Sequence, residues 1–205
     1  MPRRPDMPPL HRSELSDDPI EQFRDWYERA EQEVPLAQAM TLATVDADGA
    51  PDARMVLLKG YGPEAFRFFT NFDSAKGRQL EAVPRAALVL YWRELDRQVR
   101  VRGPVKRLPE ADSDEYFASR PRDSQIGAWA SPQSESLRDR EALDARVHEI
   151  EERFSAGDVP RPRFWGGYAL RPEEIEFWQG QAGRLHDRFR YTREGGGWRL
   201  ERLAP

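Results

Sequence analysis

The stretch that decides the fold is Met40-Thr-Leu-Ala-Thr-Val45, followed by Asp46-Ala-Asp-Gly49 and then by Ala53-Arg-Met-Val-Leu-Leu-Lys59. Two short apolar runs separated by a turn signal are typical of a β-hairpin. Residues 40–59 therefore predict two antiparallel strands. Further strands are predicted at 65–70, 86–92, 98–105, 164–170, 175–179, 187–192 and 198–202. The glycines of residues 194–197 predict the turn of the last hairpin.

Helices are predicted beside these strands rather than after each strand. Asp18 and Pro19 are typical of an N-cap and a first helical residue, and they open a predicted helix over 19–33. Other helices are predicted at 74–83, where Ser74 is a good N-cap, at 112–119 and at 135–154. This order disfavours a parallel doubly wound sheet. It favours a mainly β (α+β) fold, an antiparallel barrel with peripheral helices.

Length and composition indicate one domain over 19–205, preceded by a flexible proline-rich arm over 1–18. The chain has 205 residues, a net charge of −4 and no cysteine. The missing cysteine excludes disulfides, thiolate metal sites and a cysteine nucleophile, and is compatible with a reducing compartment. We therefore expect a cytoplasmic protein without a bound metal, a nucleic-acid partner or a membrane partner.

Two segments of the first half carry candidate anion-binding residues. Arg54 and Lys59 fall on opposite faces of one strand, so they are either two anion sites or edge-strand charges that deter aggregation. Residues 69–77 join a strand end to a helix start. Free amides there, with Ser74 and Lys76, suit a phosphate, although ordinary helix capping explains the same residues.

Two later segments add candidates. Tyr116, Arg120 and Arg122 lie around the end of a predicted helix, where arginines either bind phosphate or compensate the helix dipole. Arg184 and His186 would point the same way if residues 184–188 were extended. A histidine there could bond a substrate hydroxyl or shuttle a proton, whereas the alternative is a solvated, charge-balanced face. No dinucleotide-binding or P-loop glycine motif is present.

Taken together, the ordered motifs resemble the pyridoxamine 5'-phosphate oxidase family. They are RMVLLK at 54–59, FTN at 69–71, SRPRDSQIGAW at 119–129, FWGG at 164–167, IEFWQG at 175–180, RLHDR at 184–188 and RLAP at 202–205. The resemblance runs from about residue 18 to 205. It implies an FMN-binding split β-barrel and a homodimer with FMN at the subunit interface.

The resemblance also implies site residues. Arg184 and His186 are implied as the catalytic pair that holds the substrate ring against the flavin. The implied substrate-phosphate cradle consists of Lys59, Tyr116, Arg120 and Ser124. The implied FMN contacts, some from the partner subunit, are Arg54, Met55, Val56, Leu57, Leu58, Lys59, Phe69, Thr70, Lys76, Gln98, Gln133, Ser134, Trp178 and Arg188.

The implied reaction is oxidation of pyridoxamine or pyridoxine 5'-phosphate by O2 to pyridoxal 5'-phosphate in vitamin B6 biosynthesis or salvage. Hydrogen peroxide is released, with ammonia from the amine. Two alternatives stay open: a phenazine-biosynthesis flavin oxidase on the same scaffold, and a non-catalytic flavin or pyridoxal-phosphate carrier. The chain departs from the family at Ala75, where an arginine is usual, and Arg78 is the nearest substitute. Its short arm also lacks clear counterparts of the Arg and Tyr that often close over the substrate.

Overall fold

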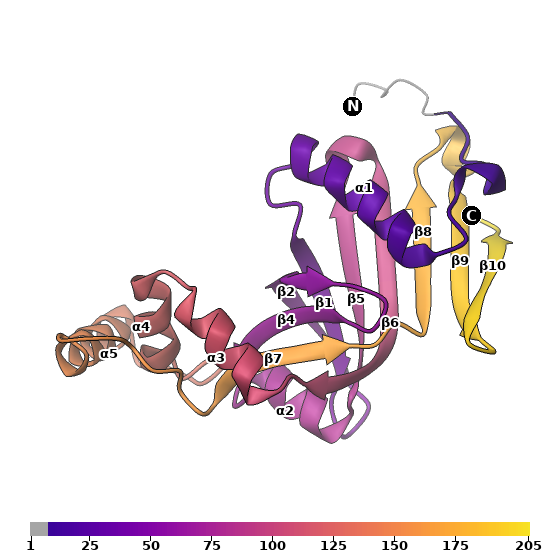
Figure 1. The fold of residues 1–205 in the computed structure, drawn as a ribbon. Coiled ribbons are helices and arrows are strands. Elements are labelled where there is room, and N and C mark those ends of the chain that lie inside the picture. Colours follow the sequence, from indigo (N-terminus) through magenta and orange to yellow (C-terminus); the bar gives the residue numbers. More distant parts are fainter. Residues whose placement is uncertain (1–7) are drawn as a thin grey trace.

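The computed structural model describes residues 8–205, so residues 1–7 of the predicted arm lie outside it. Its strands form one antiparallel sheet that curls into a barrel, with helices on the outside (Figure 1). The strands are β1 (Ala39–Val45), β2 (Pro51–Leu57), β3 (Gly60–Tyr61), β4 (Phe66–Asn71), β5 (Arg85–Trp92), β6 (Arg97–Arg107), β7 (Trp165–Leu170), β8 (Glu174–Gln179), β9 (Asp187–Glu194) and β10 (Gly197–Leu203). The helices are α1 (Pro19–Glu33), α2 (Ala75–Ala82), α3 (Glu110–Ala118), α4 (Arg122–Ala130) and α5 (Arg140–Arg153).

The long strand β6 curls the sheet. Its first part pairs with β5 and β8, and its last residues, 105–107, pair with β7. The sheet order is β10-β9-β8-β6-β5-β1-β2, and β7 leads from β6 to β4 and β3. Strand β2 forms one edge and lies beside β4 without pairing with it. The predicted antiparallel split barrel is therefore confirmed.

Local sequence signals account for the first elements. Asp18 caps α1 by accepting a hydrogen bond from the Ile20 amide, and Ser74 caps α2 by accepting from the Gly77 amide. Gly49 adopts φ 89° in the predicted hairpin turn, a conformation that favours glycine. Residues 39–45 and 51–57 pair in the register that this turn sets. The predicted helix 19–33 and the hairpin are thus confirmed.

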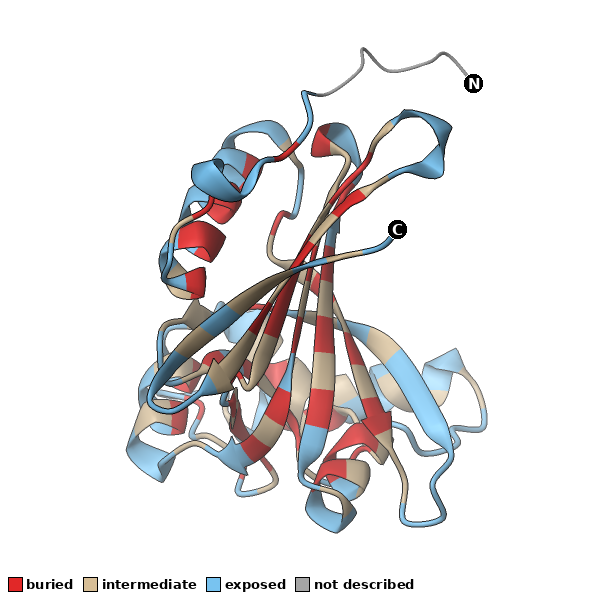
Figure 2. Ribbon diagram, turned by 90° about the vertical axis from the view of Figure 1, so that its right-hand side faces the viewer, coloured by how far each residue is buried: buried red, intermediate tan, exposed pale blue. Residues whose placement is uncertain are grey.

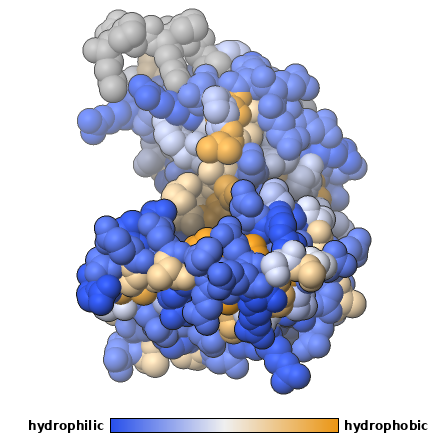
Figure 3. All heavy atoms as spheres, turned by 90° about the vertical axis from the view of Figure 1, so that its left-hand side faces the viewer, coloured by the Kyte–Doolittle hydropathy of each residue, from blue (hydrophilic) through white to orange (hydrophobic). Residues whose placement is uncertain are grey.

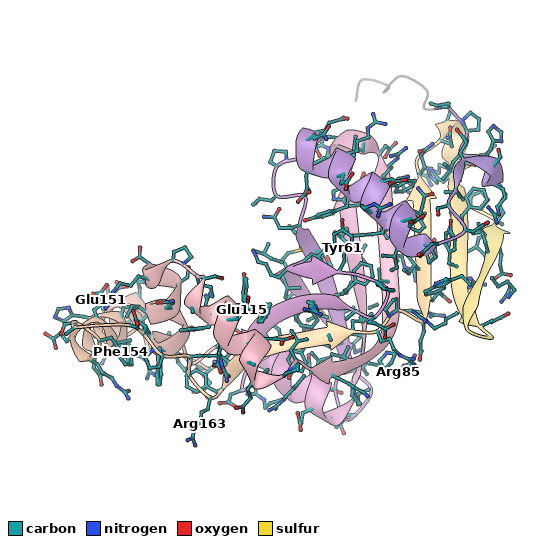
Figure 4. The ribbon with its side chains drawn as sticks, viewed as in Figure 1. Tyr61, Arg85, Glu115, Glu151, Phe154 and Arg163 are labelled. Carbon is teal, nitrogen blue, oxygen red and sulfur yellow. The ribbon has the colours of Figure 1, made fainter. Side chains whose placement is uncertain are left out.

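The core lies inside the barrel and under α1. Buried residues alternate with partly buried ones along β1, and with partly buried or exposed ones along β5, as expected for strands with one face in a core (Figure 2). Phe23 of α1 is fully buried, and its ring centroid lies 4.8 Å from that of Tyr61 and 4.9 Å from that of Phe66. Figure 4 shows Tyr61 beneath α1. These aromatic contacts fix α1 over the barrel end.

The predicted helices of the middle segment need two corrections. Residues 122–130 form α4, where no helix was predicted; only Ile126 and Ala130 of this helix are buried, too few for an apolar pattern. Helix α5 begins at Arg140 behind the N-cap Asp139, not at residue 135. Asp139 has an extended backbone and its side chain accepts a hydrogen bond from the Ala142 amide, which sets the helix start at residue 140. With α3, these helices project from the barrel around a second apolar cluster (Figure 1).

The described part of the predicted arm, residues 8–18, is packed rather than free, which corrects that expectation. Leu10 and Leu15 are each 6% exposed and belong to the core. The segment runs beside β9 and β10 (Figure 1), where the Tyr191 hydroxyl donates to the Ser16 carbonyl at 2.7 Å. Prolines and charges predicted a flexible arm, whereas two buried leucines and hydrogen bonds to backbone groups anchor the described segment. Among residues 8–205, no helix is long and apolar enough to cross a bilayer.

Candidate active site

A cavity of about 400 Å³ opens between β2, β4 and the projecting helices. The surface is hollowed on this side, with apolar residues along the hollow between strongly hydrophilic surfaces (Figure 3). The cavity brings together most of the predicted site residues: Met55, Val56, Leu57, Lys59, Phe69, Thr70, Lys76, Tyr116, Arg120, Ser124 and Gln133. Pro121 and Trp165 also line it and were not predicted. Trp165 lies in the quoted FWGG motif, which was the available signal for it.

Lys76 is a buried cation at the start of α2. It is 8% exposed, and its Nζ donates to Ser74 Oγ at 3.2 Å and to Gln133 Oε1 at 3.0 Å. Gln133 Oε1 also accepts from the Thr70 hydroxyl at 3.1 Å. Burial first, and then the nearby positive charge of Arg54, lower the pKa of Lys76 to about 8. A dianion placed here would restore the charge that burial disfavours.

Arg120 is a second cation without a full set of partners. Its Nη1 is buried and has no hydrogen-bond partner within the described residues. The guanidinium carbon lies 4.5 Å from the Trp165 ring centroid, and burial lowers the arginine pKa. Lys59 and Ser124 line the same cavity, which therefore holds three potential donors and no internal acceptor for the buried nitrogen. This arrangement fits a bound anion.

An aromatic wall stands between these polar groups. The Phe69 ring centroid is 4.0 Å from that of Tyr116 and 5.6 Å from that of Trp165, with all three rings nearly parallel. Gly167 lets Phe69 approach, since an added Cβ would meet the Phe69 ring at 2.8 Å. The wall is rigid because its rings are stacked on β4, α3 and β7, so a flat ligand would find a preformed surface.

Arg54 and Leu58 do not line the cavity. Leu58 is 4% exposed and belongs to the barrel core. Arg54 donates from Nη1 to Leu42 O at 3.2 Å and to Thr44 Oγ1 at 2.6 Å, and from Nη2 to Gln79 Oε1 at 2.9 Å. It also forms an ion pair with Asp52. Ser134, the other predicted residue of this region, is an exposed turn residue beside Gln133.

The remaining predicted residues form a second group elsewhere on the sheet. Gln98, Trp178 and Arg188 lie opposite one another on β6, β8 and β9. The His186 ring centroid lies 4.6 Å from that of Trp178. Strand β6 is three strand positions from β2, roughly 14 Å along the sheet at ordinary spacing. The predicted site therefore splits into two groups on one chain, which the sequence pattern did not reveal.

Arg184 and His186 do not follow the predicted strand alternation. Residues 182–184 form a 3₁₀ turn, and Arg184 adopts φ 64°, so the segment is not extended and the condition for a shared face is not met. The backbone amide of Gln181 donates to His186 Nδ1 at 3.1 Å. This bond leaves Nε2 as the ring nitrogen that carries the proton of the neutral imidazole.

Arg188 is held by a buried acid. Glu176 is 3% exposed and accepts from Arg188 Nε at 2.8 Å and from Arg100 Nη1 at 3.1 Å. Its hydrogen bond raises the pKa of Arg188, which stays charged. The guanidinium is thus fixed in orientation on the outer face of the sheet.

A larger cavity of about 590 Å³ lies at the far ends of β1, β5 and β6 and contains none of the predicted residues. Its two arginines, Arg85 and Arg102, pair with Glu173 and Glu174 at 2.7 Å and 2.8 Å. Because these charges are already matched, this cavity is a poorer anion site than the smaller one. Residues 8–205 contain no cluster of three or more His, Asp or Glu side chains that could hold a metal ion.

The comparisons with known proteins agree with this geometry. The sequence profile of pyridoxamine 5'-phosphate oxidase matches residues 27–154, and that of the pyridoxine 5'-phosphate oxidase C-terminal dimerisation region matches residues 165–205. The chain belongs to the pyridoxamine 5'-phosphate oxidase family. The second group of site residues, apart from Gln98, lies within the dimerisation region.

Curated family members cover nearly the whole chain. The pyridoxine/pyridoxamine 5'-phosphate oxidase of Rubrobacter xylanophilus is 56% identical over 92% of this chain and 87% of its own length. The pyridoxine-5'-phosphate oxidase of Bos taurus is 54% identical over 86% of this chain and 68% of its own length. Identity of this extent across bacterial and mammalian members places the chain within the oxidase branch of the scaffold.

Solved structures share the fold. PhzG from Burkholderia lata, in complex with tetrahydrophenazine-1-carboxylic acid, has a TM-score of 0.90 and 32% identity, covering 98% of this chain and all of its own (100%). An FMN-binding protein of Nostoc punctiforme related to pyridoxamine 5'-phosphate oxidase has a TM-score of 0.73 and 18% identity, covering 92% and 98%. The latter supports the fold alone.

Proposed function

We propose that this chain is an FMN-dependent oxidase that converts pyridoxamine and pyridoxine 5'-phosphates with O2 into pyridoxal 5'-phosphate. The observation that carries the proposal is Arg120, whose buried Nη1 lacks a partner in a cavity shared with Lys59 and Ser124. A substrate phosphate satisfies that nitrogen. The names of the curated relatives support the substrate class.

FMN would occupy the same cavity, beside the start of α2. Lys76, Thr70 and Gln133 form a linked polar group at the start of α2, and residues 55–57 of β2 form the adjoining wall. Lys76 and the helix start would hold the flavin phosphate. When bound, FMN would supply the redox chemistry, a two-electron acceptor for the substrate that O2 reoxidises with hydrogen peroxide as product.

The protein's part is to position the substrate. Arg120, held flat against Trp165, binds the substrate phosphate in a fixed direction, with Lys59 and Ser124 beside it. Anchoring this remote group holds the reacting carbon in place and makes the transfer effectively unimolecular. The aromatic wall of Phe69, Tyr116 and Trp165 excludes water from one side.

A second copy of the chain completes the site in this proposal. Gln98, Trp178, Arg184, His186 and Arg188 lie outside the cavity of their own chain. Exposed apolar side chains on the outer sheet face, Met55 at 63%, Leu57 at 41% and Tyr91 at 53%, suit a subunit contact. We assign His186 the role of donating from Nε2 to the hydroxyl oxygen on the substrate ring, and Arg184 that of covering the ring.

The similarity to PhzG supports a second candidate, oxidation of a phenazine precursor. That substrate has no phosphate, so the convergence of Lys59, Arg120 and Ser124 favours the first candidate. A carrier without turnover would need neither Arg184 nor His186. A cytoplasmic location remains part of the proposal and rests on the absence of cysteine.

The decisive experiment is an aerobic assay of the purified, FMN-loaded protein with pyridoxamine 5'-phosphate, following pyridoxal 5'-phosphate and peroxide together. We expect equal amounts of both products. A yellow protein that forms neither would exclude this function and direct attention to phenazine precursors and to the carrier role.

A further inference from the structure

The starting observation is the set of acceptors around Arg54. Its Nη1 donates to Leu42 O and Thr44 Oγ1, and its Nη2 donates to Gln79 Oε1 and pairs with the Asp52 carboxylate. Each terminal nitrogen of the guanidinium has two protons, so both nitrogens are fully used. A further anion reaches Arg54 through these nitrogens only if one acceptor gives way.

Asp52 is the acceptor that an anion would displace. Leu42 O is a backbone carbonyl, and Thr44 is 2% exposed, so both acceptors are fixed. The Asp52 side chain is 46% exposed and carries the only negative charge among the four acceptors. It is also anchored by Gln79, whose Nε2 donates to Asp52 Oδ2 at 3.0 Å. This hydrogen bond, together with the charge of Arg54, holds the pKa of Asp52 below its ordinary value, so the carboxylate is charged at neutral pH.

The Asp52 carboxylate acts on two neighbouring positive charges, those of Arg54 and Lys76. Arg54 lies close enough to Lys76 to lower the pKa of its amine, and Asp52 acts on the same amine in the opposite direction. Ala75 offers no side-chain donor at the start of α2, and Arg78 donates instead to the carbonyl of Asp73. The positive charge here therefore comes from Lys76, which lines the cavity, and from Arg54, which acts on Lys76 without lining it, and Asp52 offsets part of it.

We infer that Asp52 competes with the flavin phosphate for Arg54 and so sets the affinity of this chain for FMN relative to flavins without a phosphate. The inference rests on the proposed use of FMN. The Asp52 carboxylate holds Arg54 in place in the absence of a phosphate. When a phosphate enters, the same carboxylate weakens its binding to Arg54. Removing its charge frees one edge of the guanidinium.

The test is equilibrium dialysis of the flavin-loaded protein, with retained flavin measured by absorbance, for wild type and Asp52→Asn. Asparagine keeps the size of the side chain and its bond to Gln79 while removing the charge. We expect Asp52→Asn to retain FMN at about fivefold lower free concentration, as for a partly exposed ion pair. Riboflavin, which lacks the phosphate, should be retained equally by both proteins.

Two controls separate Arg54 from general electrostatics. Asp48→Asn makes the same charge change on the turn of the same hairpin, where the side chain is exposed, and should leave FMN retention unchanged. In an Arg54→Gln background, Asp52→Asn should lose most of its effect, because the shared partner is gone.

Several results would overturn the inference: unchanged or weaker FMN retention in Asp52→Asn, an equal gain for riboflavin, or a full gain in the Arg54→Gln background. Failure of wild type and all variants to retain FMN would instead reject the proposed function, and the inference with it. Retention of FMN by wild type with no effect of Asp52→Asn rejects the inference alone.

Discussion

The buried carboxylate of Asp187 accepts a hydrogen bond of 2.9 Å from the backbone amide of Leu10, 177 residues away in the sequence. The same carboxylate accepts from Gln181 Nε2 at 2.9 Å and from Arg202 at 2.8 Å. Pro8 O in turn accepts from the side chains of Gln179 and Gln181. The N-terminal segment and the turn that carries Arg184 and His186 are therefore one bonded unit.

Asp187→Ala should loosen that turn. Loss of several bonds to a buried carboxylate costs about 1.5–3 kcal/mol of stability, and we expect kcat/KM to fall at least tenfold with FMN content unchanged. Asp187→Asn keeps one acceptor oxygen, so its stability and its kcat/KM should lie between those of wild type and Asp187→Ala. Steady-state kinetics and thermal melts measure both effects, and wild-type kinetics in Asp187→Ala would contradict the positioning role.

FMN binding should weaken as the pH rises above about 8. The pKa of Lys76 lies near 8, below its ordinary 10.5, because the amine is buried. A bound phosphate favours the charged amine and raises this pKa, so binding is coupled to proton uptake. The affinity for FMN is then steady below pH 8 and falls as the pH rises above 8. It levels off once the pH exceeds the raised pKa of Lys76 in the complex. Lys76→Ala should bind FMN more weakly at neutral pH and lose this slope in a fluorescence titration.

Arg120→Ala should raise KM for the phosphorylated substrate. Loss of a charge-assisted bond is worth about 1.5–3 kcal/mol, or roughly 10–150-fold. Arg122→Ala is a matched control, because Arg122 donates to the carbonyls of Gly157 and Phe154 outside the cavity. It should lower the melting temperature and leave KM near wild type. Equal KM changes in both variants would remove Arg120 from the phosphate cradle.

Arg184→Ala and His186→Ala should keep FMN but lose turnover. Both residues lie outside the cavity that holds Lys76, so flavin absorbance of the purified variants should match wild type. The comparison that matters is kcat/KM for pyridoxine 5'-phosphate at saturating O2. Unchanged catalytic efficiency in Arg184→Ala would show that the active-site assignment is wrong.

Two helix glycines should respond in opposite directions to alanine. A Cβ on Gly77 would lie 2.0 Å from the carbonyl oxygen of Phe72, whereas a Cβ on Gly127 meets nothing within 4 Å. We expect Gly77→Ala to lose about 1–3 kcal/mol and to weaken FMN binding. Gly127→Ala should gain about 0.5–1 kcal/mol from reduced chain entropy. Denaturant unfolding of the two variants checks the pair.

Local sequence signals determined the first half of the fold. The turn at 46–49, the N-caps Asp18 and Ser74 and the alternation along β1 act within a few residues, so they can be read from the chain. The ordered motifs likewise indicated the family. Helix α4 could not be predicted because it buries only two apolar residues. The packing of residues 8–18 could not be predicted because the residues that they contact are far away in the sequence.

The sequence by itself determined which side chains carry the chemistry, since charge, aromaticity and motif order are properties of the residues. Only the tertiary structure decided how they are grouped. Curling of the sheet through β6 gathers Lys59, Lys76 and Arg120 in one cavity and leaves Trp178 and His186 on another face. Strand alternation could not place Arg184, because its positive φ takes it out of the strand. Such grouping depends on contacts between distant segments, which no local pattern encodes.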